Sequence, residues 1–279
     1  MTNSLFNGKW IDNDQPLILP DNRAFRYGEG LFETMRAQRG EVLLFDYHWQ
    51  RLTSSLPLLY FELPVHFKAD YLKEQIQKIC RKNKLSDAAR VRLMIFKGEG
   101  GIWEAPTSSF NCLLQCWPLS QSKPELNVNG LDIGVFEHGR KSCDIYSNIK
   151  SNNYLIYALA AQHAKSKQWN EAIVLNQHNR ICDTTIANIF FIKNNVIHTP
   201  ALSEGCVNGV MRSYLLDQFR QADIAFEEGA YTLNHLYDAD EIFLTNAIQG
   251  IRWVKSLGDT VYACRETAEL SQFVYSLMR

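Results

Sequence analysis

The sequence predicts an α+β fold of two mixed domains, and three observations point to it. The chain has 279 residues, which at roughly 150 residues per domain corresponds to about two domains. Segments with strand and helix patterns alternate irregularly, without the regular repeat of a doubly wound parallel sheet. A polar stretch with two prolines, Trp117–Leu126, is typical of a linker. The expected division is a smaller N-terminal domain at 1–116, the linker at 117–126 and a larger C-terminal domain at 127–279 that carries the lysine discussed below.

The N-terminal domain is predicted to contain two helices followed by two strands. Apolar residues recur at helical spacing over Phe45–Leu59 and Lys68–Lys82, and a proline near the end of the first segment predicts that its helix stops there. Ala88–Phe96 alternates apolar with basic residues, as a half-buried strand does, and Phe110–Cys116 is a second apolar strand. The glycine-rich Lys97–Ile102 is the expected loop between them.

The C-terminal domain is predicted to begin with a strand, a helix and a second strand. Their ranges are Leu131–Phe136, Asn153–Ser166 and Ala172–Leu175, assigned from apolar periodicity. The remaining expected elements are the strands Asn188–Lys193, Val196–His198, Glu241–Thr245 and Ile251–Val254, and the helices Gly209–Gln221 and Glu266–Met278.

Composition excludes several classes of partner. The formal net charge is −1, so no long-range field attracts nucleic acid or a membrane surface. No apolar run approaches the roughly 20 residues of a membrane span, and the first ten residues lack the pattern of a signal peptide. The seven cysteines contain no CxxC pair, which favours reduced thiols in a cytoplasmic protein over disulfides or a zinc site. We expect no metal, nucleic-acid or membrane partner.

Common catalytic motifs are missing from the sequence. There is no GxGxxG after a strand, no Walker loop, no GxSxG and no HExxH. The loop Lys97–Ile102 lacks the helix and the Lys-Ser/Thr pair of a phosphate loop, which favours a flexible loop at the edge of a cleft. The seven histidines are dispersed, and each alone favours a surface or core position.

Four segments nevertheless combine residue types that packing alone does not require. The first places a glutamate between two glycines beside aromatic and arginine residues, and the second places a lysine among amides and hydroxyls. In the third an aspartate precedes two threonines and an apolar strand, and in the fourth Asn-Gly opens a helix whose N–H groups could hold an anion. Taken singly, they are more simply interpreted as a turn, a solvated lysine, an Asx-turn and a helix cap. The segments are Phe25–Arg36, Asp144–Leu155, Ile181–Ile192 and Gly205–Arg212.

Together, in order and spacing, these segments resemble the class IV, fold type IV enzymes that use pyridoxal 5′-phosphate. That family includes branched-chain aminotransferase, D-amino-acid aminotransferase and aminodeoxychorismate lyase, and the resemblance runs from about Phe6 to about Val254. It implies two mixed domains of the D-amino-acid aminotransferase-like fold, pyridoxal phosphate as the cofactor and a small amine or amino acid as the substrate. It also implies a homodimer; aromatic residues, which are enriched at interfaces, make up 12% of the chain.

The resemblance assigns roles to residues in the matching motifs. NIKSNNYL makes Lys150 the lysine that forms the Schiff base and places Tyr154 near the phenolic oxygen of the cofactor. ICDTTIANIF places Asp183 opposite the pyridine nitrogen, and HWQRL makes Arg51 a phosphate ligand. VNGVMR and LTNAIQGI match the two further phosphate-binding segments. The expected cofactor-binding residues are Arg51, Lys150, Tyr154, Asp183, Asn188, Val210, Met211, Asn246 and Ala247.

The chemistry of such a cofactor accounts for these residue types. A lysine released by the substrate amine can move a proton at the substrate carbon. A carboxylate facing the ring nitrogen keeps the ring protonated and able to accept electrons, while an arginine and a helix N-terminus hold the phosphate. The family usually has glutamate where this chain has Asp183. Because aspartate is shorter by roughly 1.5 Å, either a local shift or a bridging water is expected.

Two reactions are compatible with this set. VNGVMR followed by TNA resembles aminodeoxychorismate lyase, in which pyruvate leaves and 4-aminobenzoate forms, whereas branched-chain aminotransferase has segments closer to LPGITR and SGT. GEGGIWEA and KSNNYL lack the basic residues usual in the lyase, and KSNNYL is closer to the transaminases. The lyase needs cations for two substrate carboxylates, and a branched-chain transaminase needs an apolar pocket. The candidate substrate-side residues are Tyr27, Phe32, Arg36, Lys97, Trp103 and Arg252.

We expect the lyase, with transamination of a branched-chain or D-amino acid as the alternative. A third hypothesis is a cofactor-free binding module, because a fold does not fix a function. Colour separates it from the enzymes, since the cofactor joined to a lysine absorbs visible light near about 400 nm.

Overall fold

The computed structural model describes residues 3–14, 16–85, 87–103, 110–120 and 124–278. Its internal contacts divide the chain into two compact units. Unit 1 comprises Met1–Lys123 and Lys150–Asn153, and unit 2 comprises Pro124–Ile149 and Tyr154–Arg279. Each unit combines a sheet with helices, which confirms the predicted α+β class. Residues 121–123 of the expected linker lie outside the described residues.

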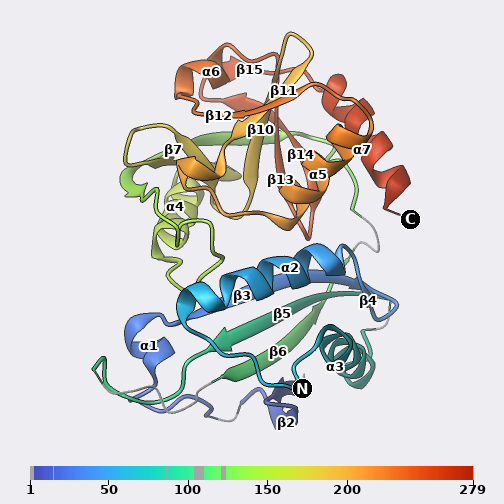
Figure 1. Cartoon of the computed structure of the whole chain (residues 1–279). Coiled ribbons are helices and arrows are strands. Elements are labelled where there is room, and N and C mark those ends of the chain that lie inside the picture. Colours follow the sequence, from blue (N-terminus) through green and yellow to red (C-terminus); the bar gives the residue numbers. More distant parts are fainter. Residues whose placement is uncertain (1–2, 15, 86, 104–109, 121–123, 279) are drawn as a thin grey trace. The chain divides into compact units, whose positions relative to one another are not determined.

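Unit 1 is built on an antiparallel sheet that, in the described residues, has six strands in the order β2-β1-β6-β5-β3-β4 (Figure 1). The central strands β3 and β5 pair from Gly30 opposite Phe96 to Gln38 opposite Ala88. The predicted alternation of β5 is confirmed over its middle, because Val91 and Leu93 are buried between more accessible residues. The strands are β1 (Asn3–Phe6), β2 (Lys9–Asp12), β3 (Gly30–Gln38), β4 (Glu41–Val42), β5 (Ala88–Phe96) and β6 (Asn111–Pro118).

The helices of unit 1 cover this sheet with apolar faces. In α3 the buried residues Leu72, Ile76, Ile79 and Cys80 recur at helical spacing, so one stripe packs against β1, β4 and β6. The first predicted helix is shorter than the range 45–59, because proline begins a separate 3-10 turn at 57. The helices are α1 (Arg23–Tyr27), α2 (Phe45–Ser55), η1 (Pro57–Leu59, 3-10) and α3 (Ala69–Lys82).

Unit 2 contains a mixed sheet in the order β12-β11-β10-β13-β14-β7-β8-β9, with β15 beside β14, among the residues described. The pairs β14–β7, β7–β8 and β11–β12 are parallel, and the other pairs are antiparallel. The strands are β7 (Leu131–Lys141), β8 (Glu171–Asn176), β9 (Ile181–Thr184), β10 (Asn188–Lys193), β11 (Val196–Pro200), β12 (Phe226–Gly229), β13 (Glu241–Asn246), β14 (Gly250–Leu257) and β15 (Thr260–Val261).

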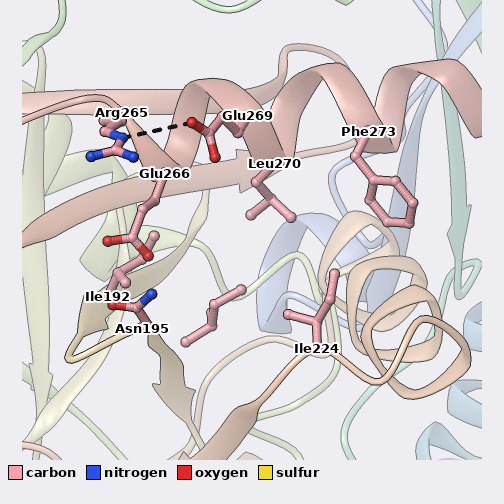
Figure 2. A pocket seen from close by; sticks show the side chains of 9 residues that line it. Ile192, Asn195, Ile224, Arg265, Glu266, Glu269, Leu270 and Phe273 are labelled. Atoms are coloured by element: carbon pink, nitrogen blue, oxygen red, sulfur yellow. Dashed lines mark ion pairs between the residues drawn. The ribbon is translucent and has the colours of Figure 1, made fainter.

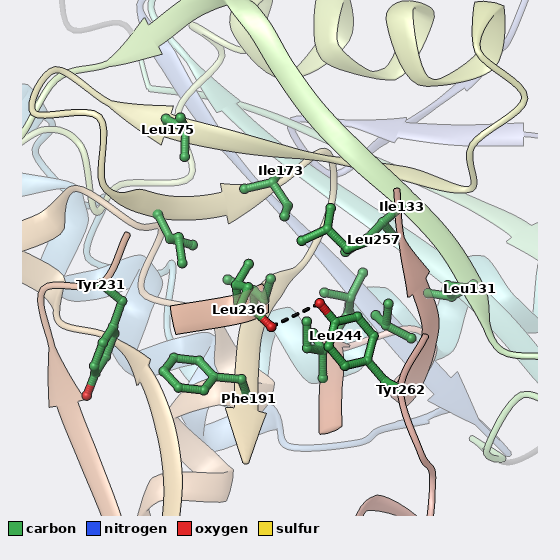
Figure 3. Packing of buried hydrophobic residues seen from close by; sticks show 14 residues of the cluster. Leu131, Ile133, Ile173, Leu175, Phe191, Tyr231, Leu236, Leu244, Leu257 and Tyr262 are labelled. Carbon is green, nitrogen blue, oxygen red and sulfur yellow. Dashed lines mark hydrogen bonds between the residues drawn. The ribbon is translucent and has the colours of Figure 1, made fainter. Parts of the chain in front are cut away.

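A hydrophobic cluster forms the core of unit 2. Ile133, Ile173 and Leu244 are among its fully buried members. Figure 3 shows Tyr262 pointing into this cluster, where its hydroxyl donates to the carbonyl of Leu236 at 2.9 Å, so the polar end of a buried tyrosine is satisfied. A second cluster packs α4 against β7 and β8. The helices are α4 (Leu155–Ser166), η2 (Leu202–Glu204, 3-10), α5 (Val210–Gln221), α6 (Leu233–Tyr237) and α7 (Glu266–Leu277).

The predicted helices of unit 2 are present within a few residues of their expected ends, while the shortest elements were not predicted. β9 and β12 have four residues each, and α6 has five, too few to show a period. β7 continues five residues beyond the expected end, past a register shift between Phe136 and Arg140. None of the helices in the described residues is both long and apolar enough to cross a membrane.

Candidate active site

The segment that carries Lys150 lies beside the start of β3 in unit 1. The N–H of Phe32 donates to the Lys150 carbonyl at 2.9 Å, and the N–H of Asn152 donates to the Gly30 carbonyl at 2.9 Å. Strand-like pairing therefore fixes the backbone of Lys150. Residues Lys150–Asn153 belong to unit 1 by their contacts, although the sequence placed this range in the C-terminal domain.

The aromatic ring of Phe32 lies next to two cationic side chains. Lys150 Nζ is 4.6 Å from the ring centroid, and the guanidinium carbon of Arg92 is 4.2 Å from it. Cations over a ring face are attracted by its quadrupole. Phe32, which the sequence assigned to the substrate side, thus contacts the side chain of the predicted cofactor lysine.

A buried carboxylate cluster connects β3 with α2. Glu33 accepts hydrogen bonds from Arg51 Nε at 2.8 Å, Arg51 Nη2 at 2.5 Å and His48 Nδ1 at 2.6 Å. His48 and Arg51 are three residues apart, so α2 presents them on one face. Glu33 and His48 are each only 2% exposed, and the contact with arginine is bidentate, which is the strongest arrangement for such a pair.

The charges in this cluster are fixed by the same contacts. Burial alone would raise the pKa of Glu33, but the Arg51 guanidinium and the His48 hydrogen bond lower it to about 2. Burial lowers the pKa of His48 despite its carboxylate partner. His48 is therefore neutral at pH 7, with its Nδ1 proton directed at Glu33, and its buried Nε2 has no hydrogen-bond partner in the described part of the chain.

This cluster changes the interpretation of Arg51. The sequence assigned it to a phosphate, and the structure shows that its guanidinium is also the counter-ion of Glu33. Sequence reasoning missed Glu33 and His48. The sequence did contain a signal for them. His48 precedes Arg51 at helical spacing, and Glu33 lies within the first segment singled out above, Phe25–Arg36.

The remaining predicted substrate residues of unit 1 occupy different environments. Tyr27 is half-buried, with the guanidinium carbon of Arg26 5.2 Å from its ring centroid. Lys97 donates to the carbonyl of Tyr60 at 2.7 Å, and burial lowers its pKa. Arg36 is buried on β3, whereas Trp103 is 97% exposed. Trp103 therefore lines no buried pocket within unit 1.

In unit 2, Asp183 is the centre of a second buried carboxylate cluster. Its Oδ2 accepts hydrogen bonds from the Tyr157 hydroxyl at 2.6 Å, from the Val207 N–H at 2.9 Å and from Lys141 Nζ at 3.3 Å. Its Oδ1 accepts from Asn188 Nδ2 at 2.9 Å. Asp183 is 2% exposed, and these four N–H and O–H donors offset the cost of burying its charge.

Asn188 joins this cluster to the start of α5. Its Nδ2 also donates to the Val207 carbonyl at 2.8 Å. A Cβ at Gly209 would overlap Asn188 Oδ1, so a larger residue here would displace the Asn188 side chain. No side chain of the described residues caps α5, and the N–H groups of Val210 and Met211 in its first turn remain available to an anion.

The other predicted cofactor residues of unit 2 lie at strand and helix ends. Asn246 ends β13, and its Oδ1 accepts the N–H groups of Ile248 and Gln249 at 3.0 and 2.8 Å, which shapes the turn that contains Ala247. Tyr154 immediately precedes α4 and donates to the Thr185 carbonyl at 3.2 Å.

Arg252 is on β14, beside a carboxylate that the sequence did not single out. Its pKa is lowered by burial and raised by Glu171. Glu171 accepts the hydroxyl and the N–H of Thr185, and burial raises its pKa. Arg252 thus has an acidic neighbour in unit 2. This neighbour was not predicted from the sequence, which assigned Arg252 to the substrate side.

A hollow of about 440 Å³ lies elsewhere on unit 2, beside α7 (Figure 2). Apolar side chains such as Ile224, Leu270 and Phe273 share its lining with Arg265 and Glu269, which form an ion pair at 3.7 Å. None of the residues predicted for cofactor or substrate lines this hollow.

The family model described as amino-transferase class IV matches residues 30–257. An aminodeoxychorismate lyase of Bacillus subtilis is 29% identical over 87% of this chain and 82% of its own length. A putative branched-chain-amino-acid aminotransferase of Methanocaldococcus jannaschii is 27% identical over 95% of this chain and 91% of its own.

Solved structures show the same fold. A putative 4-amino-4-deoxychorismate lyase of Legionella pneumophila superposes with a TM-score of 0.85 at 26% identity, covering 96% of this chain and 97% of that one. A branched-chain aminotransferase of Thermoproteus uzoniensis gives 0.88 at 21% identity, covering 99% and 94%.

Proposed function

This chain belongs to the class IV aminotransferase family, whose enzymes use pyridoxal 5′-phosphate, and we propose that it is an aminodeoxychorismate lyase. It is a pyridoxal-phosphate-dependent enzyme rather than a cofactor-free binding module. The observation that carries the lyase is the pair VNGVMR and TNA, which starts α5 and ends β13. The lyases of Bacillus subtilis and Legionella pneumophila support it as similar proteins. The reaction would release pyruvate and leave 4-aminobenzoate.

The residues of unit 2 fit this cofactor in two respects. Asp183 is a buried carboxylate. Its Oδ1 accepts one hydrogen bond from the described residues, so it can accept a second from a ring N–H. The start of α5, whose first N–H groups have no side-chain cap among the described residues, suits a phosphate. When bound, the cofactor supplies an electron sink for the carbon that carries the substrate amine.

In the proposed mechanism Lys150 has two tasks. Its Nζ would hold the cofactor covalently and would take up the proton from the substrate carbon. Phe32 keeps this side chain close by through the ring contact at 4.6 Å. Removal of a proton by lysine is common to the lyase and to a transaminase.

The other assignments follow the motifs. Asp183 balances the charge of the ring nitrogen, and Tyr154 and Asn188 lie beside that carboxylate's cluster. The guanidinium of Arg51, the first N–H groups of α5 and the turn after β13 would hold the phosphate. The full proposed set is Arg51, Lys150, Tyr154, Asp183, Asn188, Val210, Met211, Asn246 and Ala247.

An amino-acid transaminase is the second candidate, because KSNNYL is closer to that branch and the Methanocaldococcus relative bears that name. One assay decides between them. Purified protein is offered aminodeoxychorismate and, separately, L-leucine, L-glutamate and D-alanine with a 2-keto acid. Formation of 4-aminobenzoate supports the lyase, and turnover of an amino acid alone overturns it.

Cofactor attachment is tested independently of the substrate. Borohydride reduction followed by peptide mass spectrometry should find the cofactor on Lys150, and a label on another lysine would contradict the assignment. We also propose a homodimer, which sedimentation checks; an active monomer would exclude it.

A further inference from the structure

The two oxygens of the Asp183 carboxylate are not equivalent. Among the described residues, Oδ2 accepts hydrogen bonds from Tyr157, Val207 and Lys141 and a longer contact from the Cys182 thiol at 3.9 Å, whereas Oδ1 accepts one hydrogen bond, from Asn188. A carboxylate oxygen accepts about two hydrogen bonds comfortably. Oδ2 is therefore saturated, and Oδ1 retains acceptor capacity.

We propose that Lys141 and Tyr157 are positioning residues, which hold Oδ2 so that Oδ1 of Asp183 is presented to the ring nitrogen of the cofactor. The inference rests on the proposed function, because it needs a cofactor ring opposite Asp183. It assigns a task to two residues that the family motifs do not contain.

Tyr157 supplies the shortest of these hydrogen bonds. It lies on α4, is 4% exposed, and packs its ring 4.5 Å from that of Tyr154. Burial and the Asp183 charge raise the pKa of Tyr157 well above its usual value. The phenolic proton therefore stays on Tyr157, and the hydroxyl donates to the carboxylate throughout the working pH range.

Lys141 supplies the positive charge. It ends β7, with 10% of its side chain exposed, and its Nζ also donates to the Ser147 carbonyl at 2.7 Å and lies 5.2 Å from the Tyr157 ring centroid. These contacts fix the ammonium on the Oδ2 side. Its attraction, added to the hydrogen bonds of Tyr157 and Val207, holds Oδ2 in place.

An aspartate is shorter than the glutamate usual at this position, so its carboxylate must be held in a fixed orientation towards the ring. An aspartate has only two side-chain torsions, so pinning one oxygen sets the direction of the other. Without Tyr157 and Lys141 the carboxylate could rotate, and its distance to a ring nitrogen would vary. A glutamate would reach further but would leave less room for three donors at one oxygen.

The test uses the holoenzyme loaded with cofactor that is ¹⁵N-labelled at the ring nitrogen. The variants are Tyr157→Phe, Lys141→Met and Lys141→Arg. Two controls match the chemistry away from Asp183: Tyr262→Phe removes a buried hydroxyl that donates to a carbonyl, and Lys193→Met removes an exposed lysine–aspartate pair. The readouts are the ¹⁵N shift of the ring nitrogen, kcat and KM.

We expect Tyr157→Phe and Lys141→Met to move the ring ¹⁵N resonance and to lower kcat by about 10- to 100-fold, the value of a hydrogen bond to a charged group, with KM nearly unchanged. Lys141→Arg should keep the ring ¹⁵N resonance and kcat close to the wild-type values. The controls should leave the resonance in place. If Lys141→Met does not fold, Tyr157→Phe decides alone.

An unchanged resonance and kcat in Tyr157→Phe would overturn the positioning role and leave a structural one. The proposed function fails separately: if wild-type protein carries no borohydride-trapped cofactor on Lys150, both proposals are wrong. If the label is on Lys150 and no ¹⁵N change follows, only the positioning role is lost.

Discussion

Glu33 in unit 1 and Asp183 in unit 2 are two carboxylates with the same exposure, 2% each, and different surroundings. Glu33 takes all its side-chain donors from one helix, α2, and its charge is matched by a bidentate guanidinium. Asp183 takes its donors from four separate segments, mostly neutral, with a lysine at 3.3 Å.

The difference teaches that burial alone does not mark a catalytic acid. A carboxylate paired with a permanent cation in bidentate geometry is neutralised and serves to hold that cation. A carboxylate held mainly by neutral donors keeps negative charge that a further cationic group can use. On this basis Glu33 organises Arg51, which agrees with our proposal that Asp183 is the acid that faces the cofactor.

The comparison implies that unit 1 supplies chemistry through Lys150 and not through the Glu33 cluster. Lys150→Ala should therefore have the largest effect, a loss of turnover of at least about 10²–10⁴-fold, the usual contribution of a positioned acid–base group. It should also lose the borohydride-reducible link to the cofactor. Lys193→Ala is the matched control, and normal turnover in Lys150→Ala would refute the assignment.

Arg51→Ala tests whether Glu33 depends on its guanidinium partner. Removing the guanidinium leaves a buried charge uncompensated, so the free energy of unfolding should fall by about 3–5 kcal/mol. Cofactor affinity should also weaken by about 1.5–3 kcal/mol. Urea unfolding of the apoprotein and cofactor titration measure the two separately.

The double variant Arg51→Ala/Glu33→Gln removes the charge along with its partner. It should regain part of the stability but none of the cofactor affinity. Equal stability of the single and double variants would show that Glu33 is not the reason for the loss.

Acid should weaken the Glu33 cluster in a defined window. The pKa of Glu33 is lowered from 4.5 to about 2, so its contribution is complete above about pH 5 and is lost as the pH falls towards about 2, with a total of about 3 kcal/mol. Unfolding midpoints between pH 7 and pH 3 should fall less steeply for Glu33→Gln than for wild type. Parallel curves would contradict the assignment.

Substitutions at Asp183 test the carboxylate cluster of unit 2. Asp183→Asn presents an NH₂ group to donors that need an acceptor, which should cost about 1–3 kcal/mol of stability and slow turnover. Asp183→Glu adds a methylene to a buried cluster, for about 1–3 kcal/mol. Because the donors contact Asp183 directly, we expect the longer acid to reduce activity; full activity in Asp183→Glu would favour a bridging water.

The smallest effect should come from an exposed counterpart of the Lys141–Asp183 pair. Lys193 and Asp240 are 3.0 Å apart, but their side chains are 40% and 46% exposed. Lys193→Gln should change the free energy of unfolding by less than about 1 kcal/mol. A larger loss would show that burial does not govern the difference between these pairs.

Much of the fold could be predicted because its periodicities are local. The alternation in β5 and the apolar stripe of α3 follow from side-chain spacing along one element. The short strands β1, β2 and β9 could not be predicted, because four residues are stable only through pairing with distant strands.

The candidate site divides in the same way. Lys150 and Asp183 were singled out because their motifs are continuous in sequence. Lys141 and Tyr157 lie 42 and 26 residues from Asp183, and no pattern along the chain links them to it. Glu33 was inside a recognised motif, but its role appeared only when α2 brought His48 and Arg51 to it.

The dispersion of the Asp183 partners also governs when this site can form during folding. Lys141, the most distant of them in sequence, donates across 42 residues of chain, so a long loop must close before the cluster is complete. Arg51 and the α2 cluster, by contrast, need only contacts within 18 residues. A ribosome-bound chain that ends before Val207 lacks one of the Oδ2 donors, so cofactor capture should report the completion of unit 2 in a refolding time course.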